Sequence, residues 1–546
     1  MFSNVVTFVA SGPDAPVHPS FKYPATHPTP ERRTLARRPP RDDPGLSTKE
    51  SIMATISRRG LLTATATLSA AGGATALGAL PAAARPPLNP PPPDPEFTEV
   101  SVHDPSVIVA DGRFHVFGSH LAAARSENLL SWEGYADLAT PQNPLFEDVT
   151  VELAEAFAWA ETDTLWAADV AETPDGRFRM YYCACEGSSP RSAMGTAIAD
   201  RVEGPYRNEG IFLRSGMWDE PSEDGTIYDA RIHPNTIDPH AFVDAEGRRR
   251  LVYGSYSGGI FLLELDPHTG WPLPGQGYGT HLVGGNHARI EAPYILHSRR
   301  SGYYYLLLTF GGLDAAGGYN VRLGRSRDVA GPYLDPSGQD LREAKADPDL
   351  PLFDDASIEP YAAKLLGNHR FSDGPAQGVG AGYVSPGHVS AWTDEDERDV
   401  FLFLHSRFPG TGEMHQVRVH RMHLTADGWL VVSAHRYAGE AASDARSSRL
   451  HRLDLEGDWQ LVDHGRAISP EVVESRPIRL HRDGRITGDR TGRWRLEGAS
   501  RATIDLDDEV YRGVFTRGWR EDTGSWAHSF SVLGTDGRAL WGRQER

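Results

Sequence analysis

The chain has 546 residues, of which 39% are hydrophobic and 24% are charged, a composition typical of one large globular domain with smaller pieces attached. It carries 74 acidic and 55 basic side chains, a formal net charge of -19, which argues against a broad surface for nucleic acid or anionic lipid. Its two cysteines, Cys183 and Cys185, stand two positions apart in a strand-like run and are poorly placed for a disulfide.

Residues 1–52 precede the part of the sequence that is typical of a structured protein. They are rich in proline, arginine and polar residues, lack hydrophobic periodicity, and end just before a second methionine, Met53. We therefore expect a non-native or disordered N-terminal extension, with translation starting at Met53.

Residues 53–84 carry the features of an export signal. Arg58 and Arg59 precede an apolar stretch rich in alanine and threonine, and three alanines at 82–84 supply a small-residue cleavage site. This order predicts a twin-arginine signal peptide; a short membrane anchor is the alternative, but the stretch is weak for a permanent span. A proline-rich run at 85–97 predicts a stiff linker. We expect a secreted protein whose mature chain has no membrane span.

Short strand-like runs recur as a unit throughout residues 98–440. Each unit has a first strand with a polar residue, a turn, a hydrophobic strand and another strand, and the segments 104–113 and 238–248 align almost residue for residue. Further copies begin near residues 165, 291 and 387. Five such repeats predict an all-β, five-bladed β-propeller whose innermost strands line a central channel.

The C-terminal part of the chain has a different pattern. Residues 441–455 are polar and predict a linker, and residues 456–546 contain alternating strands around turns. This second region predicts a small β-barrel or β-sandwich domain.

Three carboxylates stand at matching positions of the repeat. Asp104, Asp238 and Glu291 begin the first strands of the first, third and fourth units. If those strands line the channel, the three acids converge near its axis, where like charges in a partly dry cavity separate their pKa values. Such a pair of carboxyls, one acid and one base, is what glycoside hydrolysis needs. Taken singly, each Asp is as well explained by a turn, and Glu291 by a surface position.

The motifs around these acids are recognisable. The segments 103–106, 237–239, 254–260 and 289–294, with the long run 415–440, resemble family 43 glycoside hydrolases, specifically the endo-α-1,5-L-arabinanases. The C-terminal region is similar to the β domain of the longer bacterial arabinanases. The resemblance implies arabinan and arabino-oligosaccharides as substrates.

The resemblance also implies roles for the three acids. Asp104 corresponds to the general base, Glu291 to the general acid, and Asp238 to the residue that tunes the pKa of the acid and orients it. The family inverts anomeric configuration, so Asp104 would activate a water while Glu291 protonates the leaving oxygen, with the carboxyls roughly 6.5–9.5 Å apart.

A metal is implied in the same way. His388 stands where arabinanases hold a histidine facing a hydrated ion, usually calcium, although calcium prefers oxygen ligands and a buried histidine without metal is the alternative. Two positions depart from the family pattern: Val389 replaces the usual Asn after this histidine, and Ala292 replaces the usual Gly after Glu291.

Aromatic side chains are the other ingredient of a sugar site, because the C–H face of a furanose packs on a ring. Trp166, Tyr256 and Tyr319 lie beside the innermost strands and are candidates for substrate binding, with a role in the core as the alternative.

Two other functions stay open at this point. One is an exo-acting α-L-arabinofuranosidase or β-xylosidase on the same scaffold, and the other is a carbohydrate-binding propeller without catalysis. The sequence contains no Gly-x-Ser-x-Gly or His-Glu-x-x-His motif, so serine hydrolysis and zinc proteolysis are set aside. We expect a monomer.

Overall fold

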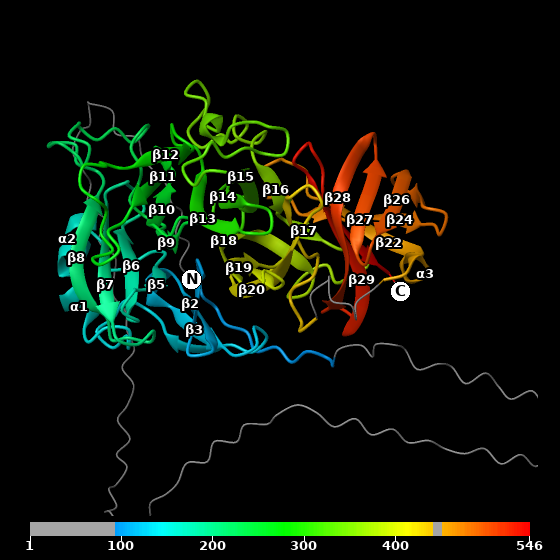
Figure 1. Cartoon of the computed structure of the whole chain (residues 1–546), viewed down its shortest axis with the longest axis horizontal. Coiled ribbons are helices and arrows are strands. Elements are labelled where there is room, and N and C mark those ends of the chain that lie inside the picture. Colours follow the sequence, from blue (N-terminus) through cyan, green and yellow to red (C-terminus); the bar gives the residue numbers. More distant parts are fainter. Residues whose placement is uncertain (1–92, 441–449, 546) are drawn as a thin grey trace, which may run out of the picture. The chain divides into compact units, whose positions relative to one another are not determined.

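The computed structural model describes residues 93–440 and 450–545 (Figure 1). The predicted extension at 1–52, the predicted signal peptide at 53–84 and most of the proline-rich linker lie outside these residues. Among the described helices, none is long and apolar enough to cross a membrane.

The first four blades are four-stranded antiparallel sheets in which neighbours along the chain pair in order. The first contains β1 (Ser106–Ala110), β2 (Arg113–Phe117), β3 (Ala123–Ser126) and β4 (Glu133–Ala136). The second contains β5 (Asp169–Glu172), β6 (Phe178–Cys185), β7 (Ser192–Ala199) and β8 (Arg207–Arg214). The third contains β9 (His240–Val243), β10 (Arg249–Ser255), β11 (Gly259–Glu264) and β12 (Thr280–Val283). The fourth contains β13 (Ile290–Ser298), β14 (Tyr303–Phe310), β15 (Asn320–Ser326) and β16 (Ala363–Leu366).

The fifth sheet has six strands. Its members are β17 (His369–Arg370), β18 (Gly382–Thr393), β19 (Val400–Arg407), β20 (His415–Leu424), β21 (Leu430–Val432) and β23 (Val473–Glu474). The innermost strands β1, β5, β9, β13 and β18 contact one another around the ring. The five repeats read from the sequence are thus confirmed as five blades.

Blade strands are buried on both faces because each sheet packs between two others. β6 and β14 are buried along almost their whole length, which explains their continuous apolar runs. Cys183 and Cys185 lie in β6 as free, buried thiols. The ring closes without a shared strand: Val107 and Val116 of the first blade pack with Phe401 and Phe403 of the fifth.

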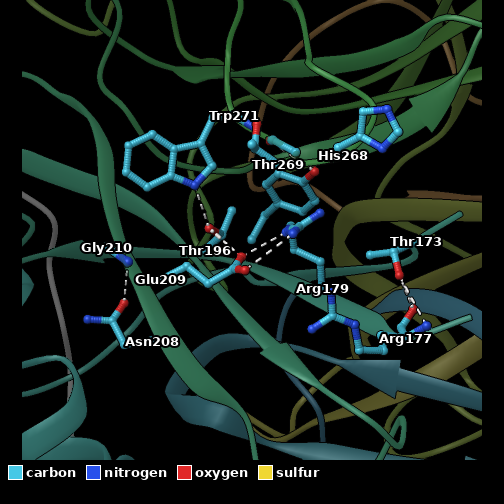
Figure 2. Close-up of polar contacts among 12 residues, drawn as sticks. Thr173, Arg177, Arg179, Thr196, Asn208, Glu209, Gly210, His268, Thr269 and Trp271 are labelled. Atoms are coloured by element: carbon cyan, nitrogen blue, oxygen red, sulfur yellow. Dashed lines mark hydrogen bonds and ion pairs between the residues drawn. The ribbon is translucent and has the colours of Figure 1, made fainter. Parts of the chain in front are cut away.

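A loop of the third blade also contacts the second blade (Figure 2). The connection between β11 and β12 brings Trp271 over β7, where its indole N–H donates to Oγ1 of Thr196 at 3.1 Å. Thr196 donates in turn to Glu209, which accepts a 2.9 Å bond from Arg179. Arg179 is 4% exposed. The network therefore stabilises the contact between the two blades and is not a candidate ligand-binding site.

Helices are minor elements of the described residues. They are α1 (Val149–Glu152), α2 (Ala154–Ala160), α3 (Arg452–Leu455) and the 3-10 turns η1 (Ser119–Leu121) and η2 (Leu341–Glu343). Asp148 caps α1 by accepting the backbone N–H of Thr150.

The C-terminal region is a closed barrel, which decides between the two predicted architectures. Its strands are β22 (Gly457–Asp463), β24 (Arg476–Leu480), β25 (Arg485–Gly488), β26 (Gly492–Glu497), β27 (Arg501–Leu506), β28 (Glu509–Arg520), β29 (Ser525–Leu533) and β30 (Ala539–Gln544). Trp459, Trp494, Phe515 and Phe530 are almost fully buried in one cluster. Side chains therefore pack the barrel core.

Candidate active site

Asp104 and Asp238 occupy the same position in two different blades. Each lies two residues before the innermost strand of its sheet, and each is followed by a proline. Their backbone φ angles are 58° and 56°, in the left-handed region that costs a non-glycine residue about 1–2 kcal/mol. Both are buried, with 8% and 6% of their surface exposed. The repeat thus delivers two strained, buried carboxylates to one end of the innermost strands.

Asp104 is surrounded by hydrogen-bond donors. Ser119, from η1, donates to Oδ2 at 2.5 Å, and Nδ1 of His103 lies 2.8 Å from the same oxygen. Nδ1 of His388, from β18, lies 3.0 Å from Oδ1. Burial opposes ionisation, but the charges of His103 and His388 and their hydrogen bonds hold the pKa of Asp104 well below its usual value. Asp104 is therefore a carboxylate at neutral pH, the state in which a carboxyl group can accept a proton.

Glu291 is the second residue of β13 and is 7% exposed. Both of its oxygens accept hydrogen bonds: Oε2 from Ser255 at 2.7 Å and Oε1 from Tyr319 at 2.9 Å. Burial raises the pKa of Glu291, and the two hydrogen bonds oppose that rise. A Cβ at position 387 would collide with the Tyr319 ring, so Gly387 gives this tyrosine the space it needs to reach Glu291.

Asp238 contacts the backbone beside the acid. Its Oδ2 accepts the N–H of Ala292, the residue after Glu291, at 3.1 Å. Burial raises the pKa of Asp238 most, and the negative charges of Glu291 and Asp104 raise it further. Because the pKa values of Asp238 and Glu291 are both raised and their charges interact, this pair retains a proton more readily than Asp104 does.

His388 lies among the three carboxylates. Its side chain is 13% exposed, and its backbone N–H donates to Oγ1 of Thr309 at 3.0 Å. Burial lowers the pKa of His388, but Asp104 and Asp238 more than offset this effect and raise it to about 9. The structure therefore pairs His388 with Asp104.

A calcium ion fits this site only through water. Calcium takes about six to eight oxygen ligands, whereas His388 offers one ring nitrogen, because its Nδ1 is directed at Asp104. Within the described residues, ligand atoms of His103, Asp104 and His405 lie within 4.8 Å of one another, and this trio is richer in nitrogen than calcium prefers. A cation at His388 would be held by Nε2, by water and by the surrounding negative charge.

Four residues that contact the acids were not predicted from the sequence: His103, Ser119, Ser255 and His405. His103 and Ser255 stood within recognised motifs, so the register of those motifs could have pointed to them. Ser119 and His405 had no such signal, because they come from other strands and loops. His405 is fully buried; its Nδ1 accepts the backbone N–H of Asp104 at 3.3 Å and its ring stacks on His103.

Asp169 begins the innermost strand of the second blade but has a structural role. It accepts a 2.5 Å bond from Ser106 of the first blade and a 2.7 Å bond from the N–H of Ala241 in the third. Both carboxylate oxygens of Asp169 thus accept hydrogen bonds that connect three blades. Asp169 is therefore not grouped with Asp104, Asp238 and Glu291 as a candidate site residue.

The three candidate aromatic residues lie at the same end of the propeller but in different settings. Tyr319 is 1% exposed and contacts Glu291, as described. Tyr256 is 5% exposed, donates to the carbonyl of Gly311 at 2.8 Å, and has its ring 5.8 Å from that of Phe353. Trp166 is half-buried beside the loop at Gly187. Trp166 is thus the candidate with the most accessible ring.

Comparison with known proteins accounts for this arrangement. Residues 97–354 match the family described as glycosyl hydrolases family 43, and residues 434–542 match a C-terminal lipocalin-like domain. The chain is 50% identical over 448 residues to extracellular endo-alpha-(1->5)-L-arabinanase 2 of Bacillus subtilis, covering 82% of this chain and 94% of that protein. It is 42% identical over 456 residues to extracellular endo-alpha-(1->5)-L-arabinanase of Thermotoga petrophila, again covering 82% and 94%.

A solved structure agrees with these relatives over the same part of the chain. The crystal structure of a family 43 glycoside hydrolase from Bacillus licheniformis is 50% identical, superposes with a TM-score of 0.79, and is matched over 83% of this chain and 100% of its own. Asp104, Asp238 and Glu291 all fall within residues 97–354, which match the family 43 description. This chain belongs to glycosyl hydrolase family 43.

Proposed function

We propose that this protein is a secreted endo-α-1,5-L-arabinanase that cleaves internal arabinofuranosidic bonds of arabinan with inversion of configuration. The observation that carries the proposal is the electrostatic division among three buried acids. Asp104 is held ionised, whereas the pKa values of Glu291 and Asp238 are raised. The two relatives named above are both endo-acting and extracellular by name, which supports the substrate and the location.

In this mechanism Asp104 accepts a proton from a water molecule as that water attacks the anomeric carbon. Its own hydrogen bonds from Ser119, His103 and His388 fix the direction of the free lone pairs. Glu291 donates its proton to the leaving glycosidic oxygen in the same step. Inversion requires the two carboxyls to stand roughly 6.5–9.5 Å apart, so that the water fits between Asp104 and the sugar.

Asp238 acts on the acid rather than on the substrate. Its charge disfavours a second negative charge on Glu291 and so keeps the acid protonated near neutral pH. The hydrogen bond from the N–H of Ala292 places Asp238 beside the segment that carries Glu291.

A hydrated calcium ion at Nε2 of His388 remains part of the proposal. Such an ion would supply positive charge near the developing charge of the reaction centre. Neutral His388 is required for its binding, so the ion and the proton on this imidazole compete.

The alternatives explain less of the site. A non-catalytic sugar-binding propeller does not require two buried acids with raised pKa values beside one with a depressed pKa. An exo-acting enzyme uses the same acids and differs in the pattern of products.

The test is the product profile on debranched linear arabinan, with the chain starting at Arg85 compared with its Glu291→Ala variant. The proposal predicts a ladder of short arabino-oligosaccharides that only the unmodified chain produces. Arabinose as the sole early product would favour the exo-acting enzyme. No cleavage by either protein would overturn the arabinanase assignment.

A further inference from the structure

A groove opens between the fourth and fifth blades at the catalytic end of the propeller. It has a volume of about 420 Å³, within the range of about 300–1,000 Å³ typical of small-molecule sites. Its walls come from three separate stretches of the propeller and from the connection between the barrel strands β22 and β24. Its lining includes Ala315, Ala376, Gln377, Phe408, Pro470 and Val472.

We propose that this groove is a distal subsite that binds the arabinan backbone several sugar units from the scissile bond. This inference rests on the function proposed above, because it names where that substrate extends beyond the three acids.

Strand register places the groove at the same end as the acids. Glu291 pairs with Thr309 near the end of β14, so the loop at 311–319 leaves the fourth blade at the level of Glu291. In the fifth blade Val384 pairs with Arg407, the last residue of β19, and the loop at 408–414 leaves there. Both loops line the groove.

Hydrogen bonds hold these two loops together as one rim. Ser385, three residues before His388, donates to the carbonyl of Asp314 at 2.7 Å. The N–H of Ala315 donates to Glu413 at 3.0 Å, and Glu413 accepts a 2.6 Å bond from Arg407. The loop at 311–319 is therefore hydrogen-bonded both to β18, the strand that carries His388, and to the loop at 408–414.

The groove and the acids are close enough along β18 for one substrate chain to contact both. Val384 lines the groove and His388 contacts Asp104, four residues further along the strand. At about 3.3 Å per residue the two positions are at most about 13 Å apart. A polymer bound at the acids would reach the groove after a few sugar units.

The lining suits a neutral sugar rather than an anion. Pro470 and Val472 supply apolar surface, Phe408 lines the groove but is only 1% exposed, and Gln377 supplies an exposed amide. Arg370 is the one charged residue of this lining, and its guanidinium donates to Glu474 at 2.7 Å, so its charge is already neutralised. Apolar walls with a few polar groups are typical of carbohydrate and other neutral-ligand sites.

The C-terminal region builds one wall of the groove. Pro470 and Val472 precede β23, which pairs in parallel with β17 of the fifth blade. Asn368 donates to the carbonyl of Ser469 at 3.2 Å, and a Cβ at Gly318 would lie 2.8 Å from the backbone of Ser469. The segment therefore sits directly on the loop that leads to Tyr319.

Substitution of an exposed alanine tests the proposal. Ala376→Trp places a bulky ring in the groove, and Ala245→Trp places the same ring at an exposed turn between β9 and β10, at the other end of the third blade. We expect Ala376→Trp to raise the KM for linear arabinan about tenfold, a loss of about 1.4 kcal/mol of binding, while the rate on arabinotriose changes less than twofold. Ala245→Trp should alter neither substrate.

Direct binding provides the second measurement. In the Glu291→Ala background, calorimetry with arabino-octaose should give a Kd about tenfold weaker when Ala376→Trp or Gln377→Ala is added, with no such change for arabinotriose. Equal effects on long and short substrates, or no effect on either, would overturn the distal subsite. If the unmodified chain cleaves no arabinan, the proposed function itself fails, and that result is distinct from a loss of length dependence.

Discussion

The hydroxyl of Tyr319 lies 2.9 Å from Oε1 of Glu291 and donates a hydrogen bond to it. This contact stabilises the charged carboxylate, whereas the proposed role of general acid requires Glu291 to hold its proton. Glu291 is thus balanced between burial, which favours the protonated form, and two hydroxyl donors, which favour the charged form. The balance sets the pH range in which the acid can work.

Tyr319→Phe removes one of those donors, so the pKa of Glu291 should rise. Because Glu291 must be protonated, the basic limb of the kcat/KM profile should move to higher pH by about one unit. Tyr253→Phe is a matched control, since that buried hydroxyl donates to the carbonyl of Tyr278. A basic limb that moves to lower pH would contradict this account of Glu291.

Asp238→Asn should have the opposite effect on the same limb. The amide keeps an acceptor for the N–H of Ala292 but removes the charge that favours protonated Glu291. We expect the basic limb to move to lower pH and kcat/KM at pH 7 to fall at least about tenfold. Asp104→Asn should instead abolish activity at every pH. A pH profile that Asp238→Asn lowers uniformly would rule out a role through Glu291.

Ala292→Gly should leave the fold unharmed or stabilise it. Ala292 has a φ of 54°, which costs about 1–2 kcal/mol for a residue with a Cβ, whereas glycine loses about 0.5–1 kcal/mol more conformational entropy on folding. The net change in the free energy of unfolding is a gain of between zero and about 1.5 kcal/mol. Ala241→Gly in β9 is the control and should destabilise. Denaturant unfolding measures both, and a clear loss in Ala292→Gly would show that the methyl packs usefully.

Acid should loosen the contact between propeller and barrel. His369, His420, His435 and His464 are buried, and burial lowers their pKa values, to about 4 for His369 and about 3 for His420 and His435. Between the unfolded value near 6.5 and these folded values, the unfolded chain binds more protons. Stability is therefore full above about pH 6.5 and falls as the pH drops, by up to about 1.4 kcal/mol per histidine for each pH unit.

Thermal unfolding at pH 7 and pH 5 checks this expectation. Neither ring nitrogen of His464 has a hydrogen-bond partner among the described residues, and its ring meets Trp541 edge-on. His464→Phe should reduce the fall in Tm between the two pH values, whereas His268→Phe at an exposed turn should not. An unchanged fall in His464→Phe would mean that other groups control acid stability.

The blades could be predicted because each repeat contains sequence features that are local to a few neighbouring residues. Short apolar runs and turns such as Asp111–Gly112 mark each unit. Asp104 and Asp238 recur at one register of that unit, whereas Glu291 lies inside β13 as its second residue. The matching positions of Asp104 and Asp238 are visible in the sequence for the same reason.

Contacts between distant strands could not be predicted from those signals. His405 reaches Asp104 from a different blade, and Tyr319 reaches Glu291 because Gly387 leaves space for its ring. β23 is only two residues long and pairs across more than a hundred residues with β17, so no local pattern reveals it. Tyr319, predicted to bind substrate, is 1% exposed and donates a hydrogen bond to Glu291.

The pairing of β23 with β17 has a consequence for the boundary between the two regions. A chain cut between residues 433 and 456 would leave β17 with an open edge and uncover backbone groups that now form a ladder. The truncated propeller would tend to recruit strands from other molecules and aggregate. A barrel exchanged for another must therefore bring its own replacement for this strand.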